Sequence, residues 1–99
     1  MSEAIEITSF RLARGTCAEF IAANAGVDAW LRQQPGFRSR RICEHSDGLI
    51  LDMLIWASVA DGEAAAGGVM MELADSPVHA LIDQATVSWS VSPVRHTVV

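Results

Sequence analysis

Lysine is absent from this 99-residue sequence, and all seven of its basic residues are arginines. Twelve acidic residues leave a formal net charge of −5. Proteins that bind nucleic acids neutralise the backbone phosphates with a stripe of basic side chains. The one arginine cluster here, formed by Arg38, Arg40 and Arg41, alternates along a predicted strand and makes no surface patch. We therefore expect no nucleic-acid partner.

Cysteine is scarce, and no hydrophobic run is long. Cys17 and Cys43 are the two cysteines, and no C-x-x-C pair occurs, so we expect reduced thiols. No segment approaches the roughly 20 consecutive apolar residues of a membrane-spanning helix. The N-terminal stretch also lacks the apolar core of a signal peptide. These absences favour a cytoplasmic protein with no membrane partner.

Motifs for common cofactors and nucleophiles are missing as well. The sequence contains no G-x-G-x-x-G or G-x-x-x-x-G-K-[ST] loop and no G-x-S-x-G motif, so it gives no support to a nucleotide cofactor or to a serine hydrolase. The histidines, at positions 45, 79 and 96, show no metal-ligand spacing. We expect neither a cofactor nor a metal site.

Hydrophobic residues make up 51% of the chain, and its length suggests one domain over residues 1–99. Alternation, capping boxes at Thr16 and Ser58, and breaks at glycine and proline predict the elements. The order is strand, helix, two strands joined by a hairpin, helix and strand. The predicted strands cover residues 5–12, 37–46, 49–57 and 87–99, with a bend at Pro93, and the predicted helices cover residues 16–33, 58–75 and 76–82. This order is the α+β, ferredoxin-like βαββαβ topology with an antiparallel sheet.

The predicted strand at residues 49–57 is apolar on both of its faces. A sheet in so small a chain covers one face with its own helices, so something else must cover the other. A second copy of the chain is the simplest candidate. The pattern therefore predicts a homodimer that forms through the sheet face.

The dipeptide Asp47-Gly48 is a strong signal for a two-residue hairpin turn. With that turn, Cys43 lies opposite Asp52 and Arg41 opposite Leu54. The side chains of Arg41, His45, Asp52 and Trp56 then share one face. Diagonal neighbours reach one another, so Asp52 meets Arg41 or His45. Two interpretations stay open for Asp52: a buried pair that fixes the register, or a polar group in a ligand cavity.

Two further places are candidates for chemistry. Trp56 ends its strand beside a helix start, so it is either core or the wall of a pocket for a flat ligand; Trp30 and Trp89 are expected in the core. His79 and Asp83 are spaced i,i+4, which would let Asp83 orient the imidazole for acid–base work. The alternative is a pair on a solvent-exposed helix face.

The stretch LILDMLIWASVADGEAAA at residues 49–66, followed by SPVHALID at residues 76–83, resembles the antibiotic-biosynthesis-monooxygenase-like, dimeric α/β-barrel superfamily. The resemblance implies a homodimer with its sheets face to face and a cavity between each sheet and its own helices. It also implies, from some relatives, a cofactor-independent monooxygenase acting on aromatic polyketides. Trp56 matches the third-strand Trp that active members use.

Two functions follow as hypotheses. In the first, the protein is a cofactor-independent monooxygenase for a small aromatic or quinone-like molecule. Trp56 walls its pocket, His79 oriented by Asp83 moves a proton, and Arg41, Asp52 or His45 holds a polar substrate atom. In the second, the protein is a non-catalytic module for small-ligand binding or dimerisation, because a fold does not fix a function.

Overall fold

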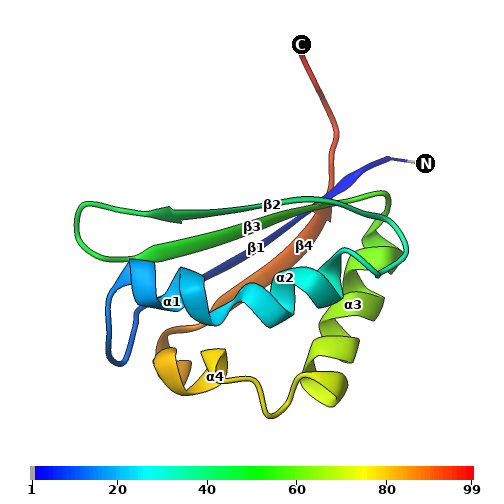
Figure 1. Ribbon diagram of the computed structural model, residues 1–99. Coiled ribbons are helices and arrows are strands. Elements are labelled where there is room, and N and C mark those ends of the chain that lie inside the picture. Colours follow the sequence, from blue (N-terminus) through cyan, green and yellow to red (C-terminus); the bar gives the residue numbers. More distant parts are fainter. Residues whose placement is uncertain (1) are drawn as a thin grey trace.

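The computed structural model describes residues 2–99 and contains a four-stranded antiparallel sheet in the order β2-β3-β1-β4 (Figure 1). Its strands are β1 (Ala4–Phe10), β2 (Phe37–Glu44), β3 (Ile50–Trp56) and β4 (Ser88–Pro93). The two central strands are β3 and β1, which come from opposite halves of the chain. The predicted ferredoxin-like topology is confirmed.

All helices lie on one side of the sheet (Figure 1). They are α1 (Cys17–Ala23), α2 (Ala25–Leu31), α3 (Val59–Glu72), α4 (Val78–Leu81) and the 3₁₀ turn η1 (Gln84–Thr86). Thr16 and Glu19 form the predicted capping box, and the Ser58 hydroxyl accepts from the Asp61 amide. The first helix, predicted to be continuous, breaks at Asn24 into α1 and α2.

The β2–β3 hairpin differs from its prediction. The His45 amide donates to Leu49 O over 2.8 Å, so the loop is residues 46–48, one residue longer than expected. Gly48 has φ +91°, which is the left-handed position of this longer loop type. The Asp47 carboxylate accepts from the Leu49 amide over 3.0 Å and holds the loop.

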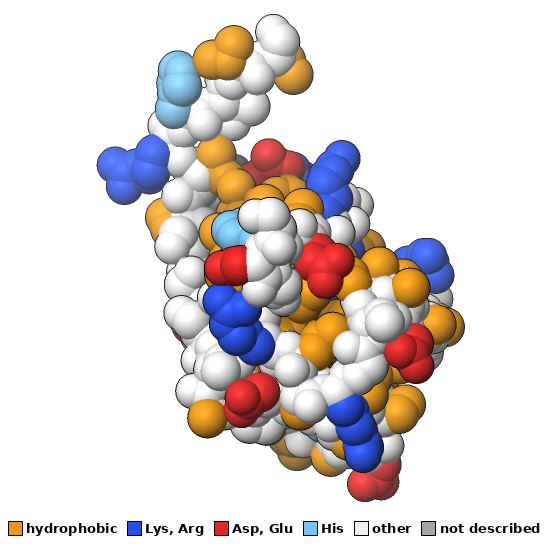
Figure 2. Space-filling model, turned by 90° about the vertical axis from the view of Figure 1, so that its left-hand side faces the viewer, with side chains coloured by type: hydrophobic (Ala, Val, Ile, Leu, Met, Phe, Trp, Pro, Cys, Tyr) orange, Lys and Arg blue, Asp and Glu red, His pale blue; other side chains and the backbone are white. Residues whose placement is uncertain are grey.

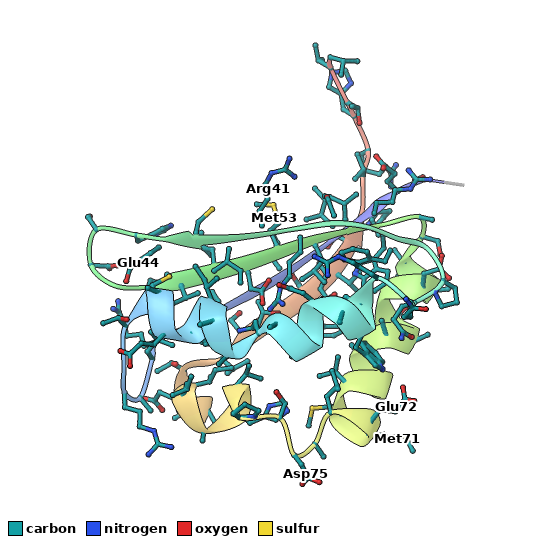
Figure 3. All side chains as sticks on the ribbon, in the orientation of Figure 1. Arg41, Glu44, Met53, Met71, Glu72 and Asp75 are labelled. Atoms are coloured by element: carbon teal, nitrogen blue, oxygen red, sulfur yellow. The ribbon has the colours of Figure 1, made fainter. Side chains whose placement is uncertain are left out.

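That extra residue shifts the register of β2 by one. Arg40 pairs with Leu54, Ile42 pairs with Asp52, and Arg41 pairs with Met53. A shift of one residue moves every side chain of a strand to the other face. The predicted placement of Arg41 beside Asp52 is therefore wrong. Figure 3 shows Arg41 and Met53 pointing away from the helices.

The sheet has a helix-covered face and an open face. The covered face supplies much of the core, with Phe10, Ile50 and Trp56 at most 1% exposed. The open face carries five apolar side chains on the two central strands, Ile5, Ile7, Leu51, Met53 and Ile55. No helix of the described residues lies over them (Figure 1).

The chain leaves the sheet after Pro93. The Val94 amide still donates to Glu3 O over 2.8 Å. Residues 95–99 then stand apart from the body on the open side of the sheet (Figure 1 and Figure 2). The predicted continuation of the last strand to residue 99 is wrong, because β4 ends at Pro93.

Candidate active site

A cavity of about 390 Å³ lies between the covered face of the sheet and the helices. Its apolar walls come from both layers and include Phe10, Phe20, Val27, Leu31, Leu54, Trp56, Val69, Leu73, Val78 and Trp89. Its polar lining is small: Glu6, Thr8, Asn24, Arg40, Asp52, His79 and Gln84. An apolar hollow with a few converging polar groups is the usual form of a small-molecule site.

Glu6 lies at the centre of the sheet between two tryptophans. It points to the covered face from β1, and its side chain is bridged by indoles from the two flanking strands. Trp56 Nε1 on β3 donates to Glu6 Oε1 over 2.8 Å, and Trp89 Nε1 on β4 donates to Glu6 Oε2 over 2.6 Å. Each carboxylate oxygen therefore fixes the orientation of one indole.

Trp56 is held from its other sides as well. It is fully buried, and the ring of Phe37 meets it edge-on with centroids 5.5 Å apart. Helix α3 approaches it at Gly62, where a Cβ would lie 3.0 Å from Trp56 Cδ1. The absence of a side chain at Gly62 thus lets α3 close over the indole.

Arg40 forms a second polar cluster on the cavity wall. Its Nε and Nη2 donate to the two oxygens of Asp52 over 3.0 and 2.6 Å, a bidentate pair. Nη2 also donates to Asn24 Oδ1 over 2.9 Å, and Nη1 donates to Asp28 Oδ1 over 2.7 Å. Burial alone would lower the pKa of Arg40, but the hydrogen bonds and charges of Asp52 and Asp28 outweigh it and raise the pKa.

Asn24 explains why the first helix breaks where it does. Its side chain is buried, donates from Nδ2 to Phe20 O over 2.8 Å and accepts from Arg40. A buried amide that bonds to a backbone carbonyl and to an arginine competes with regular helical hydrogen bonding. The break therefore delivers one polar residue of the helix layer to the Arg40 cluster.

His79 faces the same cavity from α4. Its Nε2 lies 2.8 Å from Leu73 O. A carbonyl oxygen only accepts, so Nε2 carries the hydrogen, and Nδ1 of the neutral ring is left as the nitrogen that can take a proton. The partner of the ring is thus a backbone carbonyl of the segment that links α3 to α4.

Comparisons with known proteins agree with this architecture. No protein-family model and no curated protein matches the sequence. Among solved structures, SnoaB, a cofactor-independent oxygenase from Streptomyces nogalater, superposes with a TM-score of 0.76 at 20% identity and covers 98% of this chain and 97% of its own. Rv0793 from Mycobacterium tuberculosis superposes with a TM-score of 0.70 at 18% identity and covers 98% and 100%.

A third structure is the monooxygenase from the gene ActVA-Orf6 of Streptomyces coelicolor, solved with nanaomycin D. It has a TM-score of 0.66 at 17% identity and covers 99% of this chain and 92% of its own. The chain shares the fold of these oxygenase structures and of a putative antibiotic biosynthesis monooxygenase from Chloroflexus aurantiacus. At these identities the likeness concerns the fold, so the residues of the cavity must carry the functional argument.

Within the monooxygenase-like fold, three of the residues singled out from the sequence line one cavity: Asp52, Trp56 and His79. Two others lie outside it. Arg41 is exposed on the open face, and His45 is exposed at the end of the hairpin. The one-residue change in the loop is the physical reason for both displacements. The roles suggested for Asp52, Trp56 and His79 stay predictions.

The predicted orientation of His79 by Asp83 is wrong. Helix α4 ends at Leu81 and Ile82 is extended, so the two residues do not share a helix face. The Asp83 carboxylate instead accepts from the Ala85 amide over 3.2 Å and caps η1. Trp89, expected in the core, is 46% exposed and reaches the cavity through Glu6.

Sequence reasoning missed Glu6 and Arg40. Glu6 alternates with Ala4, Thr8 and Phe10 along β1, so an acid on the apolar face of a strand was the available signal. Arg40 was missed because the two-residue turn predicted for the hairpin placed Arg41, and not Arg40, on the face of Asp52. Within residues 2–99, no group of three or more His, Cys, Asp or Glu side chains is placed to hold a metal ion, and no helix is long and apolar enough to cross a membrane.

Proposed function

We propose that the protein is a cofactor-independent monooxygenase acting on a flat aromatic or quinone-like molecule in the cavity. The observation that carries the proposal is that Trp56 and His79 line one and the same apolar cavity of about 390 Å³. The fold shared with SnoaB, a cofactor-independent oxygenase, and with the ActVA-Orf6 monooxygenase supports it.

The cavity suits an aromatic substrate for chemical reasons. Its walls are mostly apolar, and indoles from β3 and β4 stand at its sheet side. Aromatic rings pack well against such surfaces. In the proposed reaction an activated CH₂ group between aromatic rings transfers a proton to a base on the cavity wall. The electron-rich anion, paired with the protonated base, then reduces O₂ directly. The balance is CH₂ + O₂ → C=O + H₂O, so the substrate supplies all the electrons.

His79 is the proposed base. Because Nε2 is committed to Leu73 O, Nδ1 is the basic nitrogen, and the carbonyl stabilises the imidazolium that forms when Nδ1 takes a proton. The carbonyl oxygen of Leu73 therefore orients the imidazole, which is the role that was predicted for Asp83. Trp56, held by Glu6, is the proposed wall against which the ring system lies.

The proposed assembly is a homodimer through the open face of the sheet. The five apolar side chains of that face form one strip along β1 and β3. Within this strip, the side chain of Ile7 is 38% exposed in the single chain. Short serine side chains at positions 88, 90 and 92 flank the strip on β4. A second copy would present the same strip, as a two-fold interface requires. The free thiols of Cys17 and Cys43 suit the cytoplasm, which is the proposed location.

A second candidate is a binding module without catalysis. Two observations favour it. His79 has no carboxylate partner within the described residues, and Asp52, a candidate for holding a substrate atom, already has both oxygens bound by Arg40. Such a module would hold an aromatic molecule without consuming oxygen.

Oxygen uptake separates the two candidates. Anthrones, which carry a CH₂ group between two aromatic rings, would be supplied to the protein without added cofactor, in the presence of a metal chelator, and O₂ consumption followed with an electrode. The proposal expects one O₂ per carbonyl formed and a loss of about 100-fold or more in rate for His79→Gln. His45→Gln, at the exposed hairpin, is the matched control and should keep the full rate. Binding with no oxygen uptake by any compound would favour the binding module.

A further inference from the structure

Glu6 is a buried acid that forms no ion pair within residues 2–99, and both of its oxygens accept hydrogen bonds, as they do in a carboxylate. The residue is 7% exposed, and its two hydrogen-bond partners are the neutral indole N–H groups of Trp56 and Trp89. Every ion pair among residues 2–99 involves other acids: Asp28, Asp47, Asp52 and Glu3. Buried charges in proteins are usually paired, so an unpaired one on a cavity wall constrains what the cavity accepts.

Arg40 does not supply the missing charge. Its guanidinium is bound bidentately by Asp52 and also by Asp28, with N···O distances of 2.6 and 2.7 Å in the two ion pairs. Only one of its five N–H groups lacks a protein acceptor. The charged lining of the cavity is therefore one neutralised cation and an excess of carboxylate.

An anionic ligand would meet this excess directly. Its negative charge would lie in the same apolar hollow as Glu6, where repulsion is far stronger than in water. A ligand hydroxyl or ammonium group would instead find acceptor capacity on Glu6, because each carboxylate oxygen has accepted only one hydrogen bond.

We infer that Glu6 is a specificity-determining residue that restricts the cavity to aromatic molecules that carry a hydrogen-bond donor and no negative charge. Phenols, hydroquinones and arylmethyl ammonium ions belong to this class, and aromatic carboxylates are rejected. The inference rests on the proposed function only in taking the ligand to be aromatic. Beyond the proposed function, the inference states that this ligand is neutral or positively charged.

A purely structural role for Glu6 makes a different prediction. If Glu6 served only to hold the two indoles, its loss would weaken every aromatic ligand by a similar factor. If its charge selects the ligand, its loss changes the ratio between ligands. Glu6→Gln separates these effects, because it keeps the size of the side chain and one acceptor oxygen but removes the charge.

The test uses three naphthalenes of nearly equal size: 2-naphthol, 2-(aminomethyl)naphthalene and 2-naphthoate. Their affinities would be measured by titration calorimetry at neutral pH under nitrogen, so that no turnover occurs. The proteins are the wild type, Glu6→Gln and, as a control with the same change of net charge, Glu63→Gln. Glu63 is exposed on α3 and does not line the cavity.

For the wild type we expect naphthoate to bind at least about tenfold more weakly than naphthol or the amine. In Glu6→Gln this ratio should fall towards one, and in Glu63→Gln it should not change. Wild-type binding of naphthoate as tight as that of naphthol would overturn the inference, and so would a failure of all three to bind. An unchanged ratio in Glu6→Gln would do the same. If Glu6→Gln fails to fold, the wild-type ratio can still refute the inference, because a ratio near one is incompatible with it. If the protein selects against naphthoate but consumes no oxygen with any substrate, the inference about Glu6 stands and the monooxygenase proposal is rejected.

Discussion

The two faces of the sheet differ in what covers them and in where their charges lie. The buried part of the covered face holds three charged side chains, Glu6, Arg40 and Asp52, each bound by hydrogen bonds in a largely apolar setting. The open face has an apolar strip at its centre, with Arg41 projecting outward at its β2 side. Charge is thus concentrated where the protein is buried, and apolar surface is left where it is open.

This reversal is the reason for proposing that the covered face bears the function and the open face the assembly. Polar groups are kept inside an apolar layer at a cost in stability, so their presence there points to a ligand or to a structural cluster. An apolar strip left on the outside points to a partner surface. Arg40 and Arg41 are adjacent in the chain yet belong to different faces, so they offer the most direct way to test the comparison.

The largest effect is expected from Arg40→Leu. This change leaves the Asp52 carboxylate buried without its bidentate partner, and it should lower the free energy of unfolding by about 3–5 kcal/mol. Arg41→Leu removes the same charge from the neighbouring position and should change it by less than about 0.5 kcal/mol. Urea denaturation at equal protein concentration measures both.

A double variant sharpens this result. Arg40→Leu combined with Asp52→Leu removes the whole ion pair, and it should recover most of the stability lost by Arg40→Leu alone. Equal losses for Arg40→Leu and Arg41→Leu would contradict the register of the hairpin, and with it the division of charges between the two faces.

The same pair of arginines marks how far the sequence could be interpreted. The strands, the helices and their order followed from alternation and from the caps at Thr16 and Ser58, because these signals are local. The length of the hairpin loop did not, since Asp-Gly fits both a two-residue turn and the observed loop at residues 46–48. That single residue decided which arginine met Asp52.

Other parts of the site depend on contacts between distant residues. The indoles that bind Glu6 come from β3 and β4, positions 50 and 83 residues further along the chain. The partner of His79 is a backbone carbonyl, which no side-chain pattern reveals. Trp56 was identified because it ends a recognisable strand. Glu6 was not, because an acid in a short strand has no local signature of burial.

The open face is tested by Met53→Asp. A carboxylate at the centre of the apolar strip would be removed from water in the proposed dimer, once on each protomer, with only Arg41 across the ladder to offset its charge. We expect the dimer dissociation constant to rise by at least about a hundredfold. Met71→Asp, 83% exposed on α3, introduces the same group away from the strip and should leave assembly unchanged.

Sedimentation over a range of protein concentrations measures this difference between the two methionines. A wild-type protein that stays monomeric at micromolar concentration would refute the assembly proposed for the open face. A Met71→Asp protein that dissociates as readily as Met53→Asp would place the interface on the helix side instead, and the comparison between the faces would fail.

The smallest effect is expected at the hairpin loop, which sets the register that separates the two faces. The pKa of Asp47 is lowered, first by the hydrogen bond from the Leu49 amide and then by that from Arg11. A carboxyl whose pKa is lower in the folded state stabilises the fold above its unfolded pKa. That contribution disappears as the pH falls from about 3.8, the ordinary value, through the lowered one.

Asp47→Asn keeps an oxygen that can accept from Leu49 but removes the titrating charge. The wild type should therefore be slightly more stable than Asp47→Asn near neutral pH, and the difference should vanish as the pH falls below the ordinary range of Asp. Asp75→Asn, at an exposed position, should show no such convergence. Thermal unfolding at a series of pH values measures the three proteins. A difference that stayed constant with pH would mean that the Asp47 charge does not hold the loop, leaving Gly48 to fix the register that separates Arg40 from Arg41.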